Sequence, residues 1–257
     1  MTEAPDVRPF AHHWLRYGHD VGTVDPVFAT ASDLPGAVRA LLVDSGRSGQ
    51  PVARVIVFFP GFMVSPWSYR SLFASIVTDR TSIVAPQMYR RGPGPLAGRP
   101  SPTEEAEKGI ALVEHIVATR GADEVWLAGH SRGGQVAWRV AEHVDPDGLV
   151  VIDPVDGAGR NPTTLAAASE PATFTARTLI IGAGIEGRCA PTAVNHRHFA
   201  AAAPPGASHV VIDSMGHGDM LDDRPARASR LLCGGSADPR HERSAVAEMV
   251  RQFAEPG

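Results

Sequence analysis

One pentapeptide constrains the fold of this chain most strongly, Gly129-His130-Ser131-Arg132-Gly133, because it fits G-x-S-x-G between two contrasting segments. Residues 124–128 form a short apolar run typical of a buried strand, and residues 134–141 have the pattern of a helix. A serine at a tight strand-to-helix turn projects its hydroxyl above the edge of the sheet, and only small flanking residues avoid a collision there. We therefore predict that Ser131 is a nucleophile. The alternative is a serine that only caps the following helix.

Strand-like and helix-like segments alternate along the chain. Near-continuous apolar runs indicate strands covered on both faces in a parallel sheet, and apolar residues at helical spacing indicate amphipathic helices. The predicted strands are residues 21–30, 37–43, 52–59, 82–86, 124–128, 149–152, 178–181 and 209–212, and the predicted helices are residues 66–80, a helix that begins at Thr103, 134–141 and 241–253. This alternation predicts an α/β fold, with a mostly parallel central sheet flanked by helices.

We expect a single domain over residues 1–257, because a chain of this length can bury a large core. Residues 1–20 form an N-terminal segment in this scheme. The Gly/Pro-rich loop 87–102 and the irregular connection 154–177 are expected to cover the active site.

Charge and hydropathy exclude some classes of partner. The net charge is −4 and no basic cluster occurs, which argues against nucleic acid and against an anionic membrane surface. No apolar run approaches the length of a membrane span, so we expect no stable membrane insertion. The first ten residues carry acidic residues and prolines in place of an apolar signal core, so a cytoplasmic protein is expected. Oligomeric state does not follow from the sequence.

Cysteine and histidine spacing predicts neither a metal nor a cofactor. Cys189 and Cys233 are the only cysteines, and we expect partly buried reduced thiols, with a single disulfide between them as the alternative. No C-x-x-C pair occurs. The sequences His12-His13 and His196-x-His198 lack the additional ligands that a zinc site needs.

A serine hydroxyl is a weak nucleophile near neutral pH, so it needs a base and an acid that orients the base. In an α/β-hydrolase these residues follow in the order Ser, Asp or Glu, His, at the carboxyl ends of strands. Among the downstream histidines, His217 lies between two glycines just after the last predicted strand, so we predict that it is the base.

The acid is less sharply defined by position. Asp153 directly follows the predicted strand 149–152 and precedes the stiff Pro154, which favours it because an orienting group must be held rigidly. Asp156, slightly further along, and Glu186, in the Gly-rich loop after the next strand, remain open as alternatives.

An oxyanion hole needs two backbone N–H donors. The residue after the nucleophile, Arg132, is expected to supply one. The loop after the strand 52–59 is expected to supply the other through the N–H of Phe62, with Gly61 permitting a close approach.

Several motifs together resemble chlorophyllases across roughly residues 52–235. They are residues 129–134, 152–157 and 216–223 (Gly-His-Ser-Arg-Gly-Gly, Ile-Asp-Pro-Val-Asp-Gly and Gly-His-Gly-Asp-Met-Leu-Asp-Asp), with residues 59–62, 84–89 and 189–199. The resemblance implies an α/β-hydrolase that cleaves the phytyl ester of chlorophyll to chlorophyllide and phytol without a cofactor. It also implies Ser131 as nucleophile, Asp153 as acid and His217 as base.

The chain departs from that family pattern at two positions, with Pro60 in place of a histidine and Gly218 in place of a bulky apolar residue. Both departures bear on the substrate more than on the chemistry. The richness in Ala, Arg and Pro indicates a bacterial member.

The expected partner is a hydrophobic small-molecule ester. The candidate substrate contacts, all apolar or aromatic and near the predicted rim, are Met63, Trp67, Met88, Tyr89, Trp138 and Met215. We therefore predict a serine carboxylesterase that works through an acyl-enzyme. The alternatives are a thioesterase or acyltransferase of the same fold, or a non-catalytic protein that binds a hydrophobic ligand.

Overall fold

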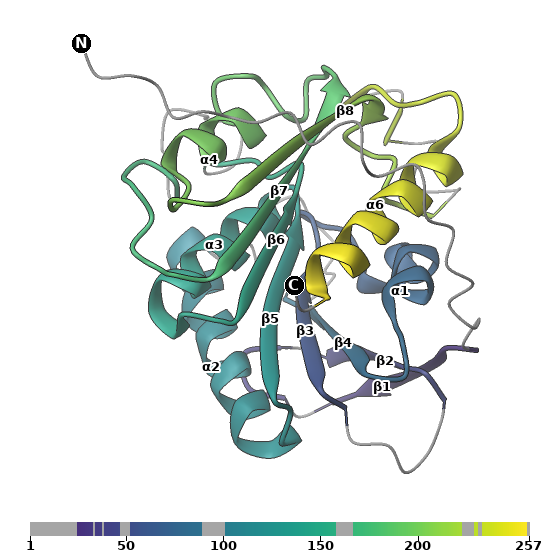
Figure 1. Ribbon diagram of the computed structural model, residues 1–257, viewed down its shortest axis with the longest axis vertical. Coiled ribbons are helices and arrows are strands. Elements are labelled where there is room, and N and C mark those ends of the chain that lie inside the picture. The colour runs from purple at the N-terminus through teal and green to yellow at the C-terminus, as the bar shows by residue number, and fades with distance from the viewer. Residues whose placement is uncertain are drawn as a thin grey trace.

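The computed structural model describes residues 25–32, 34–37, 39–46, 52–88, 101–157, 167–222, 229–230 and 233–255 (Figure 1). In this part of the chain, eight strands form one sheet in the order β1-β2-β4-β3-β5-β6-β7-β8. The strands are β1 Val27–Ala31, β2 Arg39–Asp44, β3 Arg54–Phe59, β4 Thr81–Gln87, β5 Glu124–His130, β6 Gly148–Ile152, β7 Arg177–Ile185 and β8 Ser208–Gly216.

The strands from β3 to β8 pair in parallel, whereas β1 pairs antiparallel with β2, and β2 antiparallel with β4. The prediction of a mostly parallel α/β sheet is confirmed. Because parallel strands all end at the same edge, the residues that follow β3, β5, β6 and β8 meet there. That edge holds the candidate site.

Helices cover both faces of the sheet (Figure 1). They are the 3₁₀ helix η2 Pro66–Tyr69 and the α-helices α1 Arg70–Ile76, α2 Pro102–Arg120, α3 Arg132–Val144, α4 His196–Ala202 and α6 Pro239–Ala254. Helices α1 and α6 pack in one apolar cluster, and α2, α3 and α4 pack in the other.

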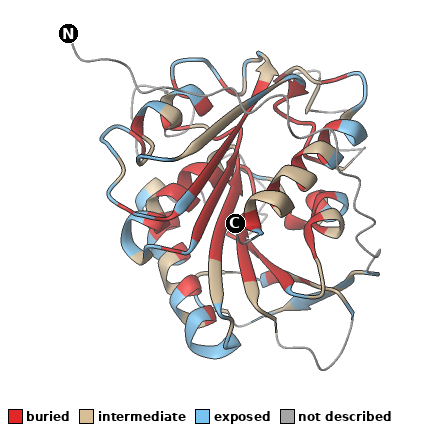
Figure 2. Cartoon of the chain, viewed as in Figure 1, coloured by how far each residue is buried: buried red, intermediate tan, exposed pale blue. Residues whose placement is uncertain are grey.

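Side chains alternate between the two clusters along each strand, as the period of a strand requires. Phe58 joins the cluster of α1 and α6, and its neighbour Phe59 joins the cluster of α2 and α3. The central strands are buried on both faces (Figure 2). This explains why their sequences are continuously apolar.

Two elements differ from the sequence prediction. The helix expected over residues 66–80 is a 3₁₀ turn followed by a helix that ends at Ile76, because Val77 is extended and Thr78 and Thr81 pair in a tight turn. Helix α4 was not predicted. Its start is marked by Asn195, whose side chain accepts a hydrogen bond from the N–H of Arg197.

Several expectations fall outside the described residues. They concern the segment 1–20, the start of the strand predicted at 21–30, most of the loop 87–102, and residues 158–166 of the connection 154–177. Within the described residues, no helix combines the length and the apolar character needed to cross a membrane. No cluster of three or more potential metal ligands occurs among those residues either.

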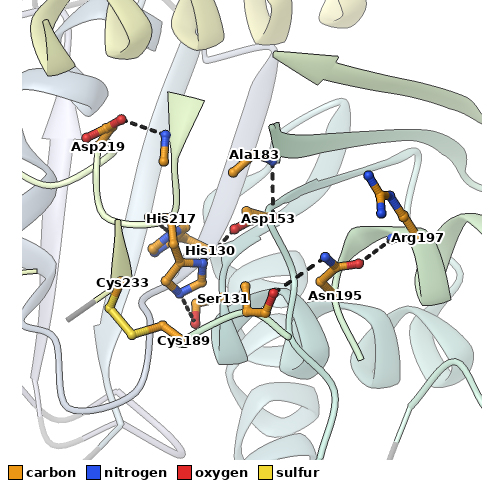
Figure 3. Close-up of polar contacts among 12 residues, drawn as sticks. His130, Ser131, Asp153, Ala183, Cys189, Asn195, Arg197, His217, Asp219 and Cys233 are labelled. Atoms are coloured by element: carbon orange, nitrogen blue, oxygen red, sulfur yellow. Dashed lines mark hydrogen bonds and ion pairs between the residues drawn. A yellow bond between two sulfur atoms is a disulfide. The ribbon is translucent and has the colours of Figure 1, made fainter. Parts of the chain in front are cut away.

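The expectation of two reduced thiols is wrong for this structure. Cys189 and Cys233 form a disulfide, with their Cα atoms 5.0 Å apart (Figure 3). The bond joins the segment after β7 to the segment before α6. These segments are 44 residues apart in sequence and meet only because both lie beside the same edge of the sheet.

Candidate active site

Ser131 lies at the turn between β5 and α3 with φ 56° and ψ −127°. A positive φ is uncommon for a residue with a side chain, and such strain is concentrated at functional sites. A Cβ at Gly129 would overlap the backbone of Gly133, and a Cβ at Gly133 would overlap the carbonyl of Phe59. The two glycines therefore allow α3 to approach β3 and β5 closely enough to form the turn.

Three distant side chains meet at this turn (Figure 3). The Oγ of Ser131 lies 2.9 Å from Nε2 of His217, and Nδ1 of His217 lies 2.6 Å from Oδ2 of Asp153. An ionised carboxylate can only accept, so Nδ1 carries the proton and Nε2 accepts from the serine hydroxyl. The structure thus brings together the three residues predicted for nucleophile, base and acid.

Asp153 is held from two sides at the end of β6. Its N–H donates to the carbonyl of Ile181 at 2.6 Å, and its Oδ1 accepts from the N–H of Ala183 at 3.2 Å. Burial raises the pKa of Asp153, but the hydrogen bond and the attraction of His217, together with the N–H of Ala183, outweigh burial. The pKa is therefore below its usual value, and Asp153 stays a carboxylate.

The alternative acids have other surroundings. The buried carboxylate of Asp156 accepts hydrogen bonds from Gln135, Gly157 and Ala167, and lies 3.2 Å from Nε2 of His198. Glu186 is exposed, and its carboxylate lies 3.5 Å from the guanidinium of Arg197. In neither case does the carboxylate contact Nδ1 of His217. Asp153 makes that contact instead.

The loop that carries His217 is anchored by Asp219. The buried Asp219 carboxylate accepts from the N–H of Gly216 at 2.7 Å and from that of Ser236 at 2.8 Å. Its backbone carbonyl accepts from Arg243 at 3.2 Å. These contacts tie both the loop after β8 and the region before α6 to one carboxylate.

The loop of residues 60–63, which we call the oxyanion loop after its predicted role, lies beside Ser131. A Cβ on Gly61 would be 3.5 Å from the Cβ of Ser131. The guanidinium of Arg132 lies 5.2 Å from the ring centre of Phe62 and 2.6 Å from the carboxylate of the buried Glu105. The two residues predicted for the oxyanion hole are therefore in contact. Their roles as N–H donors stay a prediction.

A cavity of about 1120 Å³ opens at this site. Ser131 and His217 line it, and its apolar lining residues include Phe62, Val64, Val155, Val194 and Leu221. Arg132, Arg188 and the disulfide-bonded Cys189 and Cys233 also line it. Its volume lies just above the range of roughly 300–1,000 Å³ that is common for small-molecule pockets, which suits a bulky ligand.

The sequence profile of the Chlorophyllase family matches residues 16–255. The chain belongs to the chlorophyllase family. It is accordingly a carboxylic ester hydrolase.

Curated chlorophyllases are similar to this chain. Chlorophyllase-2 of Arabidopsis thaliana is 29% identical over 227 residues, which are 77% of this chain and 71% of the relative. Chloroplastic Chlorophyllase-1 of Citrus sinensis is 32% identical over 70% of this chain and 59% of its own length. In fold, the chain is similar to carboxyl esterase 2 of Tuber melanosporum, with a TM-score of 0.63 and 15% identity, covering 93% of this chain and 90% of the esterase.

Three of the expected substrate contacts lie in the core of this chlorophyllase-family chain and are not among the residues that line the cavity. Trp138 and Met215 are fully buried, and Met88 is nearly so. Trp138 packs edge-on against Phe174 and Phe199, since it lies on the face of α3 that is turned toward the sheet and α4. The apolar character that marked these residues as substrate contacts reflects the core.

The other three expected contacts differ in their placement. Met63 is 47% exposed with φ 59°, next to Phe62 on the oxyanion loop, and its contact with substrate stays a prediction. Trp67 is half-buried against the core cluster of α1, and the guanidinium of Arg70 lies 5.5 Å from its ring centre. Tyr89 lies outside the described residues.

Sequence reasoning missed Tyr69 and His130 as parts of the site. Tyr69 belongs to the apolar face of its helix, and His130 is a variable position of G-x-S-x-G. Two signals in the sequence could have identified them. Tyr69 places a hydroxyl on an otherwise apolar helix face, and His130 places an imidazole at the end of a buried strand. Buried polar groups need hydrogen-bond partners, so each residue could have been expected to bond to a neighbour.

Proposed function

We propose that Ser131, His217 and Asp153 form a catalytic triad that hydrolyses a bulky hydrophobic ester through an acyl-enzyme. The observation that carries this proposal is the continuous path from the Ser131 hydroxyl to Nε2 of His217 (2.9 Å) and from Nδ1 to Asp153 (2.6 Å), at the wall of a large cavity. Binding alone does not require this arrangement.

The first half of the reaction forms the acyl-enzyme. The Oγ of Ser131 attacks the ester carbonyl carbon while its proton passes to Nε2 of His217, and Asp153 stabilises the resulting imidazolium. The oxyanion accepts hydrogen bonds from the N–H groups of Phe62 and Arg132 in this scheme. The bond between the carbonyl carbon and the alkoxy oxygen then breaks, and His217 returns the proton to the departing alcohol.

The second half releases the acid. Water attacks the acyl carbon and gives a proton to Nε2 of His217. The bond between the acyl carbon and Oγ of Ser131 then breaks, and His217 returns the proton to Oγ, which leaves a carboxylic acid and free Ser131. No cofactor takes part in these steps.

The family supports chlorophyll as the substrate, with chlorophyllide and phytol as products. The mainly apolar side chains Phe62, Val64, Val155 and Leu221 suit an ester with little polar surface. A cytoplasmic location and a bacterial origin remain proposals.

Labelling tests the nucleophile. A fluorophosphonate probe should label the wild-type protein and leave Ser131→Ala unlabelled, since the probe reacts with an activated serine. The folded state of the variant is checked by its thermal unfolding midpoint. Absence of label on folded wild-type protein would favour a protein that only binds its ligand.

A substrate panel tests the reaction. We expect turnover of p-nitrophenyl esters, chlorophyll a and pheophytin, each abolished by Ser131→Ala. Acyl thioesters belong in the same panel, because the triad serves thioester cleavage and acyl transfer equally well. Turnover confined to thioesters would reject the carboxylesterase in favour of the thioesterase.

A further inference from the structure

A buried hydrogen-bond chain runs behind the candidate triad. The N–H of Gly61 lies 3.0 Å from the hydroxyl oxygen of Tyr69, which lies 2.9 Å from Nδ1 of His130. The Nε2 atom of His130 lies 2.7 Å from the backbone carbonyl of His217. The chain therefore starts on the oxyanion loop and ends on the predicted base.

The chemistry of the groups sets the direction of every bond. A carbonyl only accepts, so Nε2 of His130 carries the proton and donates to His217. The other ring nitrogen, Nδ1, must then accept, and the Tyr69 hydroxyl is its donor. The oxygen of that hydroxyl accepts from the N–H of Gly61. The Tyr69 hydroxyl and the His130 ring each donate one hydrogen bond and accept another, and no other arrangement satisfies all three hydrogen bonds.

Packing holds the chain in place. Tyr69 is completely buried, with Phe58 and Phe73 ring centres 5.1 and 5.8 Å from its own. His130 is 2% exposed, and its ring centre lies 4.9 Å from that of His217 (Figure 3). Rings packed this closely cannot change rotamer without opening a cavity.

The His130 ring and the Tyr69 hydroxyl do not change their charge between weakly acidic and alkaline pH, so the hydrogen-bond directions stay the same. Burial, followed by the nearby ring of His217, lowers the pKa of His130 to about 3. Burial also raises the pKa of Tyr69 well above its usual value. Both groups are therefore neutral over the range in which an esterase works, and the donor directions do not change.

We propose that Tyr69 and His130 are positioning residues, which hold the oxyanion loop and the backbone of His217 in fixed relation to Ser131. Neither side chain reacts with the substrate. They act through the two groups that must converge on it, the N–H donors of the loop and the ring of the base. The inference rests on the proposed triad and adds the hydrogen-bonded residues that fix the positions of its groups relative to one another.

Single substitutions separate the links of this chain. Tyr69→Phe removes only the hydroxyl and leaves Gly61 and Nδ1 of His130 without their partner. His130→Leu removes both contacts of the ring. His130→Gln keeps an N–H donor within reach of the His217 carbonyl, so it serves as the conservative variant.

The expected result is a loss of kcat without a matching change in KM. Tyr69→Phe and His130→Leu should lower kcat for a p-nitrophenyl ester by roughly tenfold to a hundredfold, because small misplacements of reacting groups are costly. KM should change by less than about threefold, since Tyr69 does not line the cavity and His130, which does, is only 2% exposed. His130→Gln should recover most of the rate lost in His130→Leu. The double variant Tyr69→Phe/His130→Leu should be no slower than His130→Leu alone, because both lie in one chain.

A matched control removes a buried hydroxyl elsewhere. Thr178→Val deletes the 2% exposed hydroxyl that donates to the carbonyl of Ala176 at the amino end of β7, away from the site. Its thermal midpoint should fall about as far as that of Tyr69→Phe, and its kcat should stay within roughly twofold of wild type.

NMR spectroscopy tests the position of the His217 ring in a way that does not depend on substrate turnover. The proton between Nδ1 of His217 and Asp153 gives a low-field NMR resonance, which should shift or broaden in Tyr69→Phe and His130→Leu but not in Thr178→Val. An unchanged resonance together with unchanged kcat in both site variants would overturn the inference, as would additive losses in the double variant. Absence of Ser131-dependent turnover in the wild type would overturn the proposed function instead, and the resonance would still decide the positioning role.

Discussion

The guanidinium of Arg132 lies against the ring of Phe62, at 5.2 Å from its centre, and the buried Glu105 fixes it there through contacts of 2.6 Å from both Nε and a terminal nitrogen. The residue after the nucleophile and the centre of the oxyanion loop are thus joined by their side chains. Helix α2, which supplies Glu105, contributes to the site through this ion pair.

Glu105→Gln should weaken catalysis because it weakens the ion pair that holds Arg132 against Phe62. Burial raises the pKa of Glu105 to about 7 against the attraction of Arg132, so its charge is fully present only in weak alkali. There the amide keeps an acceptor but loses the charge, and a charge-assisted hydrogen bond is about twice as strong as a neutral one. We expect kcat/KM for a p-nitrophenyl ester to fall about tenfold, equivalent to about 1.4 kcal/mol. The matched control is Glu124→Gln in the Arg54–Glu124 pair at the amino end of β5, where the contact is 2.7 Å. Equal losses in the two variants would contradict a specific role of Glu105.

Asp153→Asn should cost on the order of 10⁴ in kcat while leaving the protein folded, because an amide cannot hold the imidazole in the correct tautomer and stabilise its charge. Steady-state kinetics measures the loss of kcat, and the thermal unfolding midpoint shows whether the variant is folded. Asp156→Asn is the control, since Asp156 binds Gln135, Gly157 and Ala167 instead. A larger loss of kcat in Asp156→Asn than in Asp153→Asn would show that the acid is misassigned.

Stability should fall in weak acid because of His130. Its pKa is about 3 in the folded protein, owing mainly to burial, against an ordinary value of 6.5. The folded state therefore keeps it neutral where the unfolded chain takes up a proton. The stabilisation is present above about pH 6.5 and is lost by about 1.4 kcal/mol per pH unit as the pH falls toward 3.

Urea unfolding at a series of pH values between 8 and 4 measures this dependence. His130→Gln should show a flatter decline of the free energy of unfolding than wild type, because one of the groups that titrate is gone. The depressed pKa of Asp153 acts in the same direction but only near and below the ordinary carboxyl range. Parallel pH curves for wild type and His130→Gln would contradict this account.

The disulfide should stabilise the folded protein substantially. Cys189 and Cys233 close a loop with a sequence separation of 44, for which chain entropy predicts about 4 kcal/mol. Cys189→Ser/Cys233→Ser should lower the thermal midpoint, and dithiothreitol should lower that of wild type but not that of the double variant.

Alkylation of the cysteines in cells tests whether the protein lies in a reducing or an oxidising compartment. In a reducing cytoplasm the two cysteines would be thiols, whereas an oxidising compartment preserves the bond. Rapid alkylation of cells, followed by non-reducing electrophoresis, distinguishes the two forms. Modified cysteines would support the proposed cytoplasmic location, and protected cysteines would contradict it.

The sequence by itself determined the fold class and pointed to the three side chains that the structure brings together at the candidate site. Apolar runs marked the strands. Ser131 and Asp153 follow the central strands β5 and β6, and His217 follows the edge strand β8. Because parallel strands end at one edge, order along the chain predicted that Ser131, His217 and an acidic residue converge, and left Asp156 and Glu186 open beside Asp153 as the acid. The strained turn at Ser131 was equally local, since it depends on glycines within two or three residues.

Tertiary structure alone decided what depends on contacts between distant segments. Trp138 and Met215 have the composition of a ligand wall, yet packing places them in the core, because apolar residues suit either environment. Tyr69 and His130 are 61 residues apart, and Cys189 and Cys233 are 44 apart. No local pattern pairs such residues, since the partner of a buried polar group or a thiol is set by how helices and loops pack around the sheet.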